Sequence, residues 1–369
     1  MNIPKLRFKE FNDDYEMKEV ADITYNVSSG KISKQLEDGK YNVYGSIGII
    51  GKSNFYDYTG EKVLVARVGA NAGSVNKINE KCCISDNTLV LDPKDILNDY
   101  LYYSLSHYDP KKLIFGSGQP LVTGGQLKKI KLGIPSKEEQ IKTSNFLSLL
   151  DKKIELQTKK IEDLKLFKSG QIVKKIKSLD CKEVELKKFG YFISSNSIGK
   201  EKITISGVPL ILYGDLYTKY SEEITKINQY IKDNEKYIKS EINDLLFPTS
   251  TTVDAISLIS PSVINIANVV YGGDLLIFKT ISSNVNPKFL SYQINHFKRK
   301  EFAKKAQGTT IIHIHANDLL SSKVKIPDLN TQILIAHFGN KINKKIELET
   351  LKLNKLKSLK KGLMQNLFV

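Results

Sequence analysis

Residues 135–170 read PSKEEQIKTSNFLSLLDKKIELQTKKIEDLKLFKSG, and a related stretch returns at residues 327–362 as PDLNTQILIAHFGNKINKKIELETLKLNKLKSLKKG. The second copy follows the first by 192 residues without a gap. Between Lys131–Ile176 and Lys323–Phe368, 17 of 46 aligned positions are identical. Internal repeats of this kind fix the architecture of a chain. The chain is therefore predicted to consist of two related halves.

The repeated stretch is predicted to be a coiled-coil helix, because apolar residues recur every three or four positions in both copies. The predicted seam comprises Leu147, Leu150, Ile154, Gln157, Ile161 and Leu164 in the first copy and Ile342, Ile346, Glu349, Leu353 and Leu356 in the second. The polar Gln157 and Glu349 correspond to each other, and such residues commonly fix the register of a coiled coil. We expect the two helices to pair antiparallel. The alternative is two unrelated amphipathic surface helices.

The segments that precede the two helices have the mixed pattern of short strands and helices typical of α/β modules. In the second segment, Leu245–Thr252 stands where Lys62–Ala70 stood, Ala267–Phe278 where Cys82–Leu91 stood, and Pro287–Phe297 where the expected helix Asn98–Leu105 stood. Asn98 or Asp99 is expected to cap that first helix. We predict an α+β fold with a pseudo-two-fold repeat, in which two long helices separate the two modules. The expected boundaries are 1–135 and 180–327 for the modules and 136–179 and 328–369 for the helices.

The composition favours a polyanionic partner. The chain carries 56 Lys and Arg against 40 Asp and Glu, a net charge of +16, and such an excess most simply fits nucleic acid. A lysine-rich solvated surface is the alternative. Three cysteines, the lack of an apolar leader and the lack of a long apolar run indicate a cytoplasmic protein without a membrane segment.

The sequence shows no catalytic motif that we would defend. Ser46–Ser53 (SIGIIGKS) nearly matches a phosphate-binding loop, but a serine stands where the first glycine is needed. Neither a methyltransferase motif nor a hydrolase elbow is present. His313 and His315 would share one face of a strand, but two histidines without further ligands are a weak metal signal. We predict that the chain has no metal site.

With these features in hand, the chain resembles the specificity (S) subunit of type I restriction–modification systems. The resemblance rests on Pro4-Lys5-Leu6-Arg7-Phe8, on two Ile-Pro segments each followed by Gln-Ile and a Lys-Lys-Ile-Glu-Leu helix, and on a Gly/Thr-rich loop before each copy. These loops are Gly116-Ser117-Gly118-Gln119-Pro120 and Gly308-Thr309-Thr310-Ile311-Ile312. The order of these motifs, duplicated at constant spacing, carries the resemblance across nearly the whole chain.

The resemblance implies that each module is a target recognition domain that reads one half of a bipartite site in double-stranded DNA. It implies that the helices set the spacing and dock two methyltransferase (M) subunits, with the restriction (R) subunits joined through M. The chain itself would be non-catalytic and hold no cofactor. S-adenosylmethionine, ATP and Mg²⁺ would belong to the partner subunits. The alternatives are a coiled-coil adaptor that binds no DNA and a stand-alone DNA-modifying enzyme.

Base readout requires side chains with directed donors and acceptors. The candidates are Lys34, Arg67, Asn71, Gln119 and Thr123 in the first module and Lys200, Ser250, Thr251, Thr309, Thr310 and His313 in the second. Arg67 is the strongest of them because an arginine at the end of an apolar strand can bind a guanine edge bidentately; a structural ion pair is its alternative. For the serines and threonines the alternative is capping of a turn.

Overall fold

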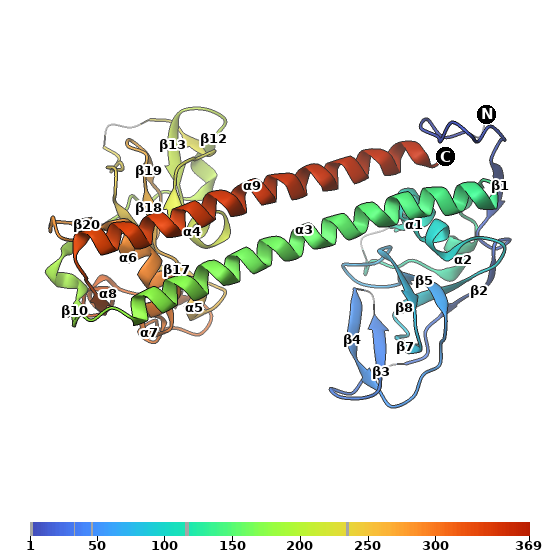
Figure 1. Cartoon of the computed structure of the whole chain (residues 1–369), viewed down its shortest axis with the longest axis horizontal. Helices are drawn as coiled ribbons and strands as arrows, with labels where there is room; N and C mark the ends of the chain where they lie inside the picture. Colours follow the sequence, from blue (N-terminus) through green and yellow to red (C-terminus); the bar gives the residue numbers. More distant parts are fainter. Residues whose placement is uncertain (1–2, 33, 46, 115–117, 234–235) are drawn as a thin grey trace. The chain divides into compact units, whose positions relative to one another are not determined.

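Two long helices, α3 (Lys137–Lys177) and α9 (Leu329–Leu367), dominate the computed structural model, which describes residues 3–32, 34–45, 47–114, 118–233 and 236–369 (Figure 1). The chain forms two compact units. The first contains Met1–Thr158 and Leu351–Val369, and the second contains Lys159–Thr350. Each unit therefore combines one α/β module with part of both helices. The four segments expected from the sequence describe the order along the chain, whereas the compact units cut across both helices.

The first module is built on an antiparallel sheet with the strand order β2-β8-β5-β6. Its strands are β2 (Thr24–Ser29), β5 (Glu61–Ala66), β6 (Val75–Asn79) and β8 (Thr88–Pro93), and its helices are α1 (Asn98–Tyr108) and α2 (Gly124–Lys128). A second sheet, β4-β3-β7, contains β3 (Tyr41–Gly45), β4 (Gly48–Ser53) and β7 (Cys82–Ile84), and β1 (Glu16–Glu19) pairs with β9 (Lys131–Ile134). Strand β5 is buried on both faces, because Val63 and Val65 enter one apolar core and Leu64 enters another.

The second module repeats this topology, with the strand order β11-β20-β16-β18-β14. Its main strands are β11 (Gly190–Ser194), β14 (Glu223–Ile224), β16 (Leu245–Pro248), β18 (Ser262–Ile264) and β20 (Leu275–Thr280). The smaller pairings involve β10 (Glu183–Glu185), β12 (Ile203–Thr204), β13 (Val208–Ile211), β15 (Tyr230–Ile231), β17 (Ser250–Thr251), β19 (Val270–Tyr271), β21 (Ile312–His313) and β22 (Lys323–Lys325). The helices are α4 (Tyr213–Thr218), α5 (Ala255–Leu258), α6 (Pro287–Gln293), α7 (Arg299–Ala303) and α8 (Ala316–Leu320). Strand β14 is the addition, because the sheet of the first module stops at β6.

The loose correspondences expected between the modules agree with this topology. Strand β16 occupies the place of β5, β19 and β20 occupy those of β7 and β8, and α6 occupies that of α1. One detail differs from expectation. The N-cap of α1 is Leu97, so the prediction of Asn98 or Asp99 as the cap is wrong. Gly51-Lys52-Ser53 lies on strand β4, which pairs with β3, rather than in a loop before a helix as phosphate binding requires; Ser46 lies outside the described residues.

The helices run antiparallel within each unit. In the second unit, Lys160 Nζ donates to Glu349 Oε1 at 3.0 Å and Lys168 Nζ donates to Asn343 Oδ1 at 2.8 Å, so residue numbers rise along α3 as they fall along α9. In the first unit, Lys360 of α9 pairs with Asp151 of α3. The predicted α+β fold, with two α/β modules and two antiparallel long helices, is thereby confirmed.

The predicted seam residues are all buried or half-buried. Five of them are buried, namely Leu147, Leu150, Ile161, Glu349 and Leu353. The other six are half-buried, namely Ile154, Gln157, Leu164, Ile342, Ile346 and Leu356. Glu349 is buried because Lys160 neutralises it, which explains how a carboxylate is tolerated in an apolar seam.

The repeated Ile-Pro and Gln residues join each long helix to its module. Gln140 Nε2 donates to the Pro135 carbonyl at 3.1 Å, and Gln140 Oε1 accepts from the Leu97 N–H at 3.0 Å, directly before α1. Gln332 repeats both bonds, with the carbonyl of its own proline at 2.8 Å and the N–H of Asn286 at 2.8 Å, directly before α6. One glutamine thus aligns the start of a long helix with the start of a module helix in each unit.

The N-terminal segment, which contributed Pro4–Phe8 to the resemblance, fastens onto the first turns of α3. Arg7 binds Glu139 bidentately at 2.9 and 2.7 Å, and the Tyr15 hydroxyl donates to the same carboxylate at 2.8 Å. The ring of Phe8 packs edge-on against Phe146, with 6.0 Å between centroids. This charge-assisted contact explains why a polar segment is ordered against a helix. None of the helices in the described ranges is long and apolar enough to cross a bilayer.

Candidate nucleic-acid interface

In the first module, the chain leaving β5 pairs with the loop that precedes α2. The Val122 N–H donates to the Arg67 carbonyl at 2.8 Å, and the Gly69 N–H donates to the Pro120 carbonyl at 3.0 Å. Both segments belong to loops at one edge of the sheet. We call residues 67–73 and 118–122 the first ribbon. These bonds bring together side chains that are about 50 residues apart in the sequence.

The first ribbon brings together three of the predicted DNA-binding residues. Asn71 and Gln119 are exposed, and Arg67 is half-buried. The guanidinium of Arg67 makes no hydrogen bond or ion pair to the residues that the structure describes. The alternative of a structural ion pair is therefore not favoured. Free arginine, asparagine and glutamine side chains are the types that bind purine edges in the major groove.

Two lysines beside the first ribbon, Lys111 and Lys112, were not among the residues predicted from the sequence. Gly73 has φ +82°, and a Cβ atom there would lie 2.5 Å from the backbone nitrogen of Lys111. This close approach of the turn brings Lys111 and its neighbour Lys112 next to the ribbon, and both are exposed. They follow Asp109, which ends α1, but nothing in the local sequence signals their proximity to Arg67. The cluster has the mixture of phosphate-binding lysines and base-reading side chains expected at a DNA interface.

Thr123 and Lys34 stand apart from this cluster. Thr123 is the N-cap of α2, and its Oγ1 accepts from the Gln126 N–H at 3.2 Å and donates to Gln126 Oε1 at 2.9 Å. This capping box favours the structural alternative for Thr123. Lys34 is exposed on a loop, a place suited to phosphate contact.

The second module contains the same ribbon. The Ile314 N–H donates to the Thr249 carbonyl at 3.0 Å, as Val122 does to Arg67 in the first module, and Ser250 of β17 pairs with His313 of β21. The Gln307 N–H donates to the His313 carbonyl at 2.8 Å, and the His313 N–H donates to the Gln307 carbonyl at 2.7 Å. We call residues 249–251 and 307–314 the second ribbon.

The tip of the second ribbon presents the predicted Thr309, Thr310 and His313, all of which are exposed. Gly308, which opens the tip, has φ +114°, and a Cβ atom there would lie 2.1 Å from the Ile311 carbonyl oxygen. Only glycine fits this position without rearrangement. The tip is thus a tight loop whose two hydroxyls and imidazole point away from the core.

Ser250 and Thr251 are buried and bonded internally. Ser250 Oγ donates to Asp274 Oδ2 at 2.9 Å, and Thr251 Oγ1 accepts from the Val253 N–H at 3.1 Å. Both hydroxyls stabilise the turn after β16, so the structural alternative, which the sequence allowed, fits them better than base contact. Lys200 is exposed on the short 3-10 turn Lys200–Lys202, outside the second ribbon.

The two ribbons share a backbone but differ in their side chains. Arg67 of the first corresponds to Thr249 of the second, and Leu121 corresponds to His313, because the bonds from Val122 and Ile314 are equivalent. A conserved scaffold with different side chains is the arrangement expected of two readers that recognise different sequences.

The long helices expose apolar side chains at repeated positions. Three pairs of matching positions, 192 residues apart, are exposed to similar extents. They are Ile141 and Ile333 (both 45%), Leu156 and Leu348 (58 and 59%), and Phe167 and Leu359 (49 and 53%). The same exposed apolar positions therefore recur in both helices. Among the described residues, no group of three or more His, Cys, Asp or Glu side chains is placed to hold a metal ion.

Known proteins share this architecture. A Mycoplasma pneumoniae protein named as a type I specificity subunit is 28% identical over 147 residues, which are 38% of this chain and 48% of that protein; the aligned part therefore spans about half of that relative. The MjaVIII specificity subunit of Methanocaldococcus jannaschii is 25% identical over 412 aligned positions, covering 97% of this chain and 94% of that one. The crystal structure of the S subunit from M. genitalium has the same fold, with a TM-score of 0.65 at 16% identity and coverage of 100% and 99%.

The family described as the type I restriction modification DNA specificity domain matches residues 11–166 and again residues 174–358. The two matches correspond to the two modules, each with the helix that follows it, and together they cover most of the chain. The chain belongs to the family of type I restriction–modification DNA specificity subunits and carries two copies of its domain.

Proposed function

We propose that this chain is the target-reading subunit of a type I restriction–modification complex, in which each ribbon reads one half of a bipartite site in double-stranded DNA. The observation that carries the proposal is the same ribbon built twice with different exposed side chains, in a chain of net charge +16. Lysines such as Lys111 and Lys112 would contact phosphates and supply most of the affinity, while Arg67, Asn71, Gln119 and the tip of the second ribbon would select the bases.

The long helices would fix the distance between the two readers. Helix α3 has 41 residues and α9 has 39, so each extends about 60 Å at 1.5 Å per residue. An antiparallel pair in a common register resists both bending and sliding better than a flexible linker of the same length. Two weak readers held at a fixed distance bind one long site more tightly than either binds its half.

The partners follow from the repeated apolar positions of the helices. Two equivalent patches suit two copies of one partner, which we assign to the methyltransferase subunits, with restriction subunits joined through them. In this proposal the chain itself performs no catalysis and works in the cytoplasm. The methyltransferase would bind S-adenosylmethionine, and the restriction subunit would use ATP and Mg²⁺. The family, the two domain copies and the exposed Leu156 and Leu348 support the assignment.

The DNA-binding proposal is tested by selection from a library of randomised duplexes with the full chain bound to its methyltransferase partner. We expect enrichment of a motif with two specified halves and an unspecified spacer of constant length. Affinity should fall steeply with salt, since the slope of log K against log salt is about −0.9 for each phosphate contact. An adaptor without DNA contacts would enrich nothing. Methyl transfer by the chain alone would indicate instead the stand-alone enzyme.

The docking proposal is tested by Leu156→Glu and Leu348→Glu, singly and together, with the number of bound methyltransferase subunits measured by native mass spectrometry. Each single variant is expected to weaken binding at its own site by at least about tenfold, because a buried unpaired carboxylate opposes association. The double variant should lose both sites. Leu166→Glu is the matched control, because Leu166 is 72% exposed but corresponds to Ser358, so a repeated surface cannot depend on it. Equal losses in Leu166→Glu would contradict the assignment.

A further inference from the structure

The added strand of the second module, β14, faces the long helices rather than solvent. Glu222 directly precedes β14 and Glu223 begins it. Both side chains are 5% exposed, although each carries a carboxylate. Burying a charge is costly unless partners compensate for it. The identity of those partners shows what the strand does.

Glu222 binds both helices of the pair at once. Its carboxylate accepts two bonds from Lys168 Nζ of α3, at 2.7 and 2.9 Å, and one from Asn343 Nδ2 of α9 at 2.9 Å. His296, in the π-helical turn Ile294–Lys298 that continues α6, binds the same carboxylate through Nε2. Lys168 also donates to Asn343 Oδ1 at 2.8 Å, which closes the cluster. We call Glu222, Lys168, Asn343 and His296 the Glu222 cluster.

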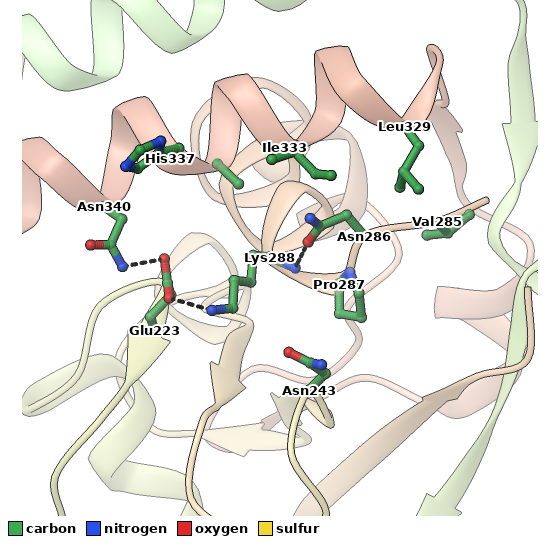
Figure 2. Close-up of a pocket in the computed structure, with 11 residues that line it drawn as sticks. Glu223, Asn243, Val285, Asn286, Pro287, Lys288, Leu329, Ile333, His337 and Asn340 are labelled. Atoms are coloured by element: carbon green, nitrogen blue, oxygen red, sulfur yellow. Dashed lines mark hydrogen bonds and ion pairs between the residues drawn. The ribbon is translucent and has the colours of Figure 1, made fainter. Parts of the chain in front are cut away.

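Glu223 extends these contacts along α9. Its carboxylate accepts from Asn340 Nδ2 at 2.8 Å and pairs with Lys288 of α6 at 3.3 Å, as Figure 2 shows. The Tyr292 hydroxyl also donates a hydrogen bond to this carboxylate at 3.2 Å. A groove of about 530 Å3 runs past this carboxylate between the starts of α6 and α9 (Figure 2). The Glu223 carboxylate binds α9 through Asn340 and α6 through Lys288, so it too joins the module to α9.

A glycine in α9 allows the module to approach closely. A Cβ atom at Gly339 would lie 2.4 Å from the ring of Tyr292, so the ring rests directly on the helix backbone. Gly339 weakens α9 by about 1 kcal/mol relative to alanine, and this contact explains its presence. The corresponding residue of α3 is Leu147, so the first module lacks such an approach.

The first unit uses the same positions differently. Asp151 corresponds to Asn343 and Lys360 to Lys168, and these two residues pair with each other between the helices. The module contributes Tyr103, whose hydroxyl donates to Asp151 at 2.8 Å and whose ring centroid lies 5.5 Å from Lys360 Nζ. In the first unit the helix pair thus supplies both charges. In the second unit the lysine depends on a carboxylate from the recognition module.

The pKa of the Glu222 carboxyl reflects these contacts. Burial alone raises it, but the bond from His296 and the charge of Lys168 outweigh burial, so the pKa lies well below its ordinary value of 4.5. A lowered pKa in the folded state means that the cluster stabilises the fold above about pH 4.5 and loses that contribution as the pH falls further. At neutral pH the carboxylate is ionised, and its bonds to both helices are intact.

We propose that Glu222 is a positioning residue that fixes the second recognition module on the helix pair and thereby sets the permitted spacing between the two DNA half-sites. The inference rests on the proposed function. Glu222 lies outside the second ribbon, and its carboxylate binds Lys168, Asn343 and His296, none of which is a candidate base-reading residue. Its effect passes through the geometry of the module: a carboxylate bonded to both α3 and α9 holds the module against the two helices, and its bond to His296 ties it to the rest of the module.

The test compares methylation by complexes containing wild-type chain, Glu222→Gln, or the charge-neutral pair Lys168→Met with Glu222→Gln. The methylated motif is read by long-read sequencing of a genome that expresses the complex with its methyltransferase. The double variant leaves no unpaired buried charge, which protects folding. We expect both variants to keep the first half-site and to methylate sites with spacers one base pair longer or shorter at least tenfold more often than wild type.

Glu349→Gln is the matched control, since Glu349 is also buried in the second unit and binds Lys160 of the helix pair. It should keep the wild-type spacing. Unchanged spacing in both Glu222 variants would overturn the proposal. So would equal loss of both half-sites, or a loss of all methylation in both variants, because either result shows only a folding role. If the wild-type complex yields no bipartite motif, the proposed function itself fails.

Discussion

Replacing Arg67 with alanine is expected to weaken binding of the cognate duplex by about 10- to 100-fold and to relax selection at one position of the first half-site. The estimate follows from the 1–3 kcal/mol that a bidentate side chain contributes to discrimination between bases. Arg67 is half-buried at the root of the first ribbon, with its backbone held by Val122 and its guanidinium unpaired with the described residues. Competition binding against duplexes altered at single positions measures both effects.

Lys111→Ala is the control for Arg67. Lys111 is exposed beside the same ribbon, and a lysine that contacts phosphate binds all sequences alike. We expect it to weaken cognate and altered duplexes equally and to reduce the salt slope by about one unit. Arg67→Ala should change the slope little by comparison. If Arg67→Ala left cognate binding unchanged, or weakened all duplexes equally, Arg67 would not be a base-reading residue.

The sequence contained the large features of the fold because they depend on local periodicity. The 192-residue repeat and the spacing of Leu147, Leu150 and Ile154 predicted the long helices and their seam. The same offset extends into the ribbons, where Val122 and Ile314 make equivalent bonds. The order of strands within the modules could be predicted only by aligning each segment of one half with the corresponding segment of the other.

The contacts that decide function depend on distant residues and left little local signal. Lys111 lies beside Arg67 because Gly73 permits a close approach, and no pattern of spacing shows this. Ser250 is a polar residue in a loop-like stretch, but Asp274 binds it in the interior. Glu222 looks like an ordinary surface residue of an acidic pair, yet it is buried against Lys168, which lies 54 residues earlier in the chain. Burial of a paired charge is a tertiary property.

The second large effect is predicted from the helix pair. Lengthening it should change the spacing between the two half-sites without changing the bases that are recognised. Inserting three heptads into both helices, after Thr158 in α3 and after Thr350 in α9, lengthens the pair at the boundary between the compact units. The 21 added residues extend each helix by about 31 Å. At 3.4 Å per base pair this is about nine base pairs. Whole heptads keep the apolar seam in phase.

We therefore expect the selected motif to keep both half-sites and to gain a spacer longer by about nine base pairs. This is close to one turn of the duplex, about 10 base pairs, so both ribbons would again meet nearly the same side of the DNA. Selection from a randomised library measures the spacer directly. The same insertion in α3 alone is the control, and it should abolish two-site binding because Leu351–Val369 of α9, which belongs to the first unit, would then fall three heptads short of it. An unchanged spacer in the double insertion would mean that the helices do not set the distance between the readers.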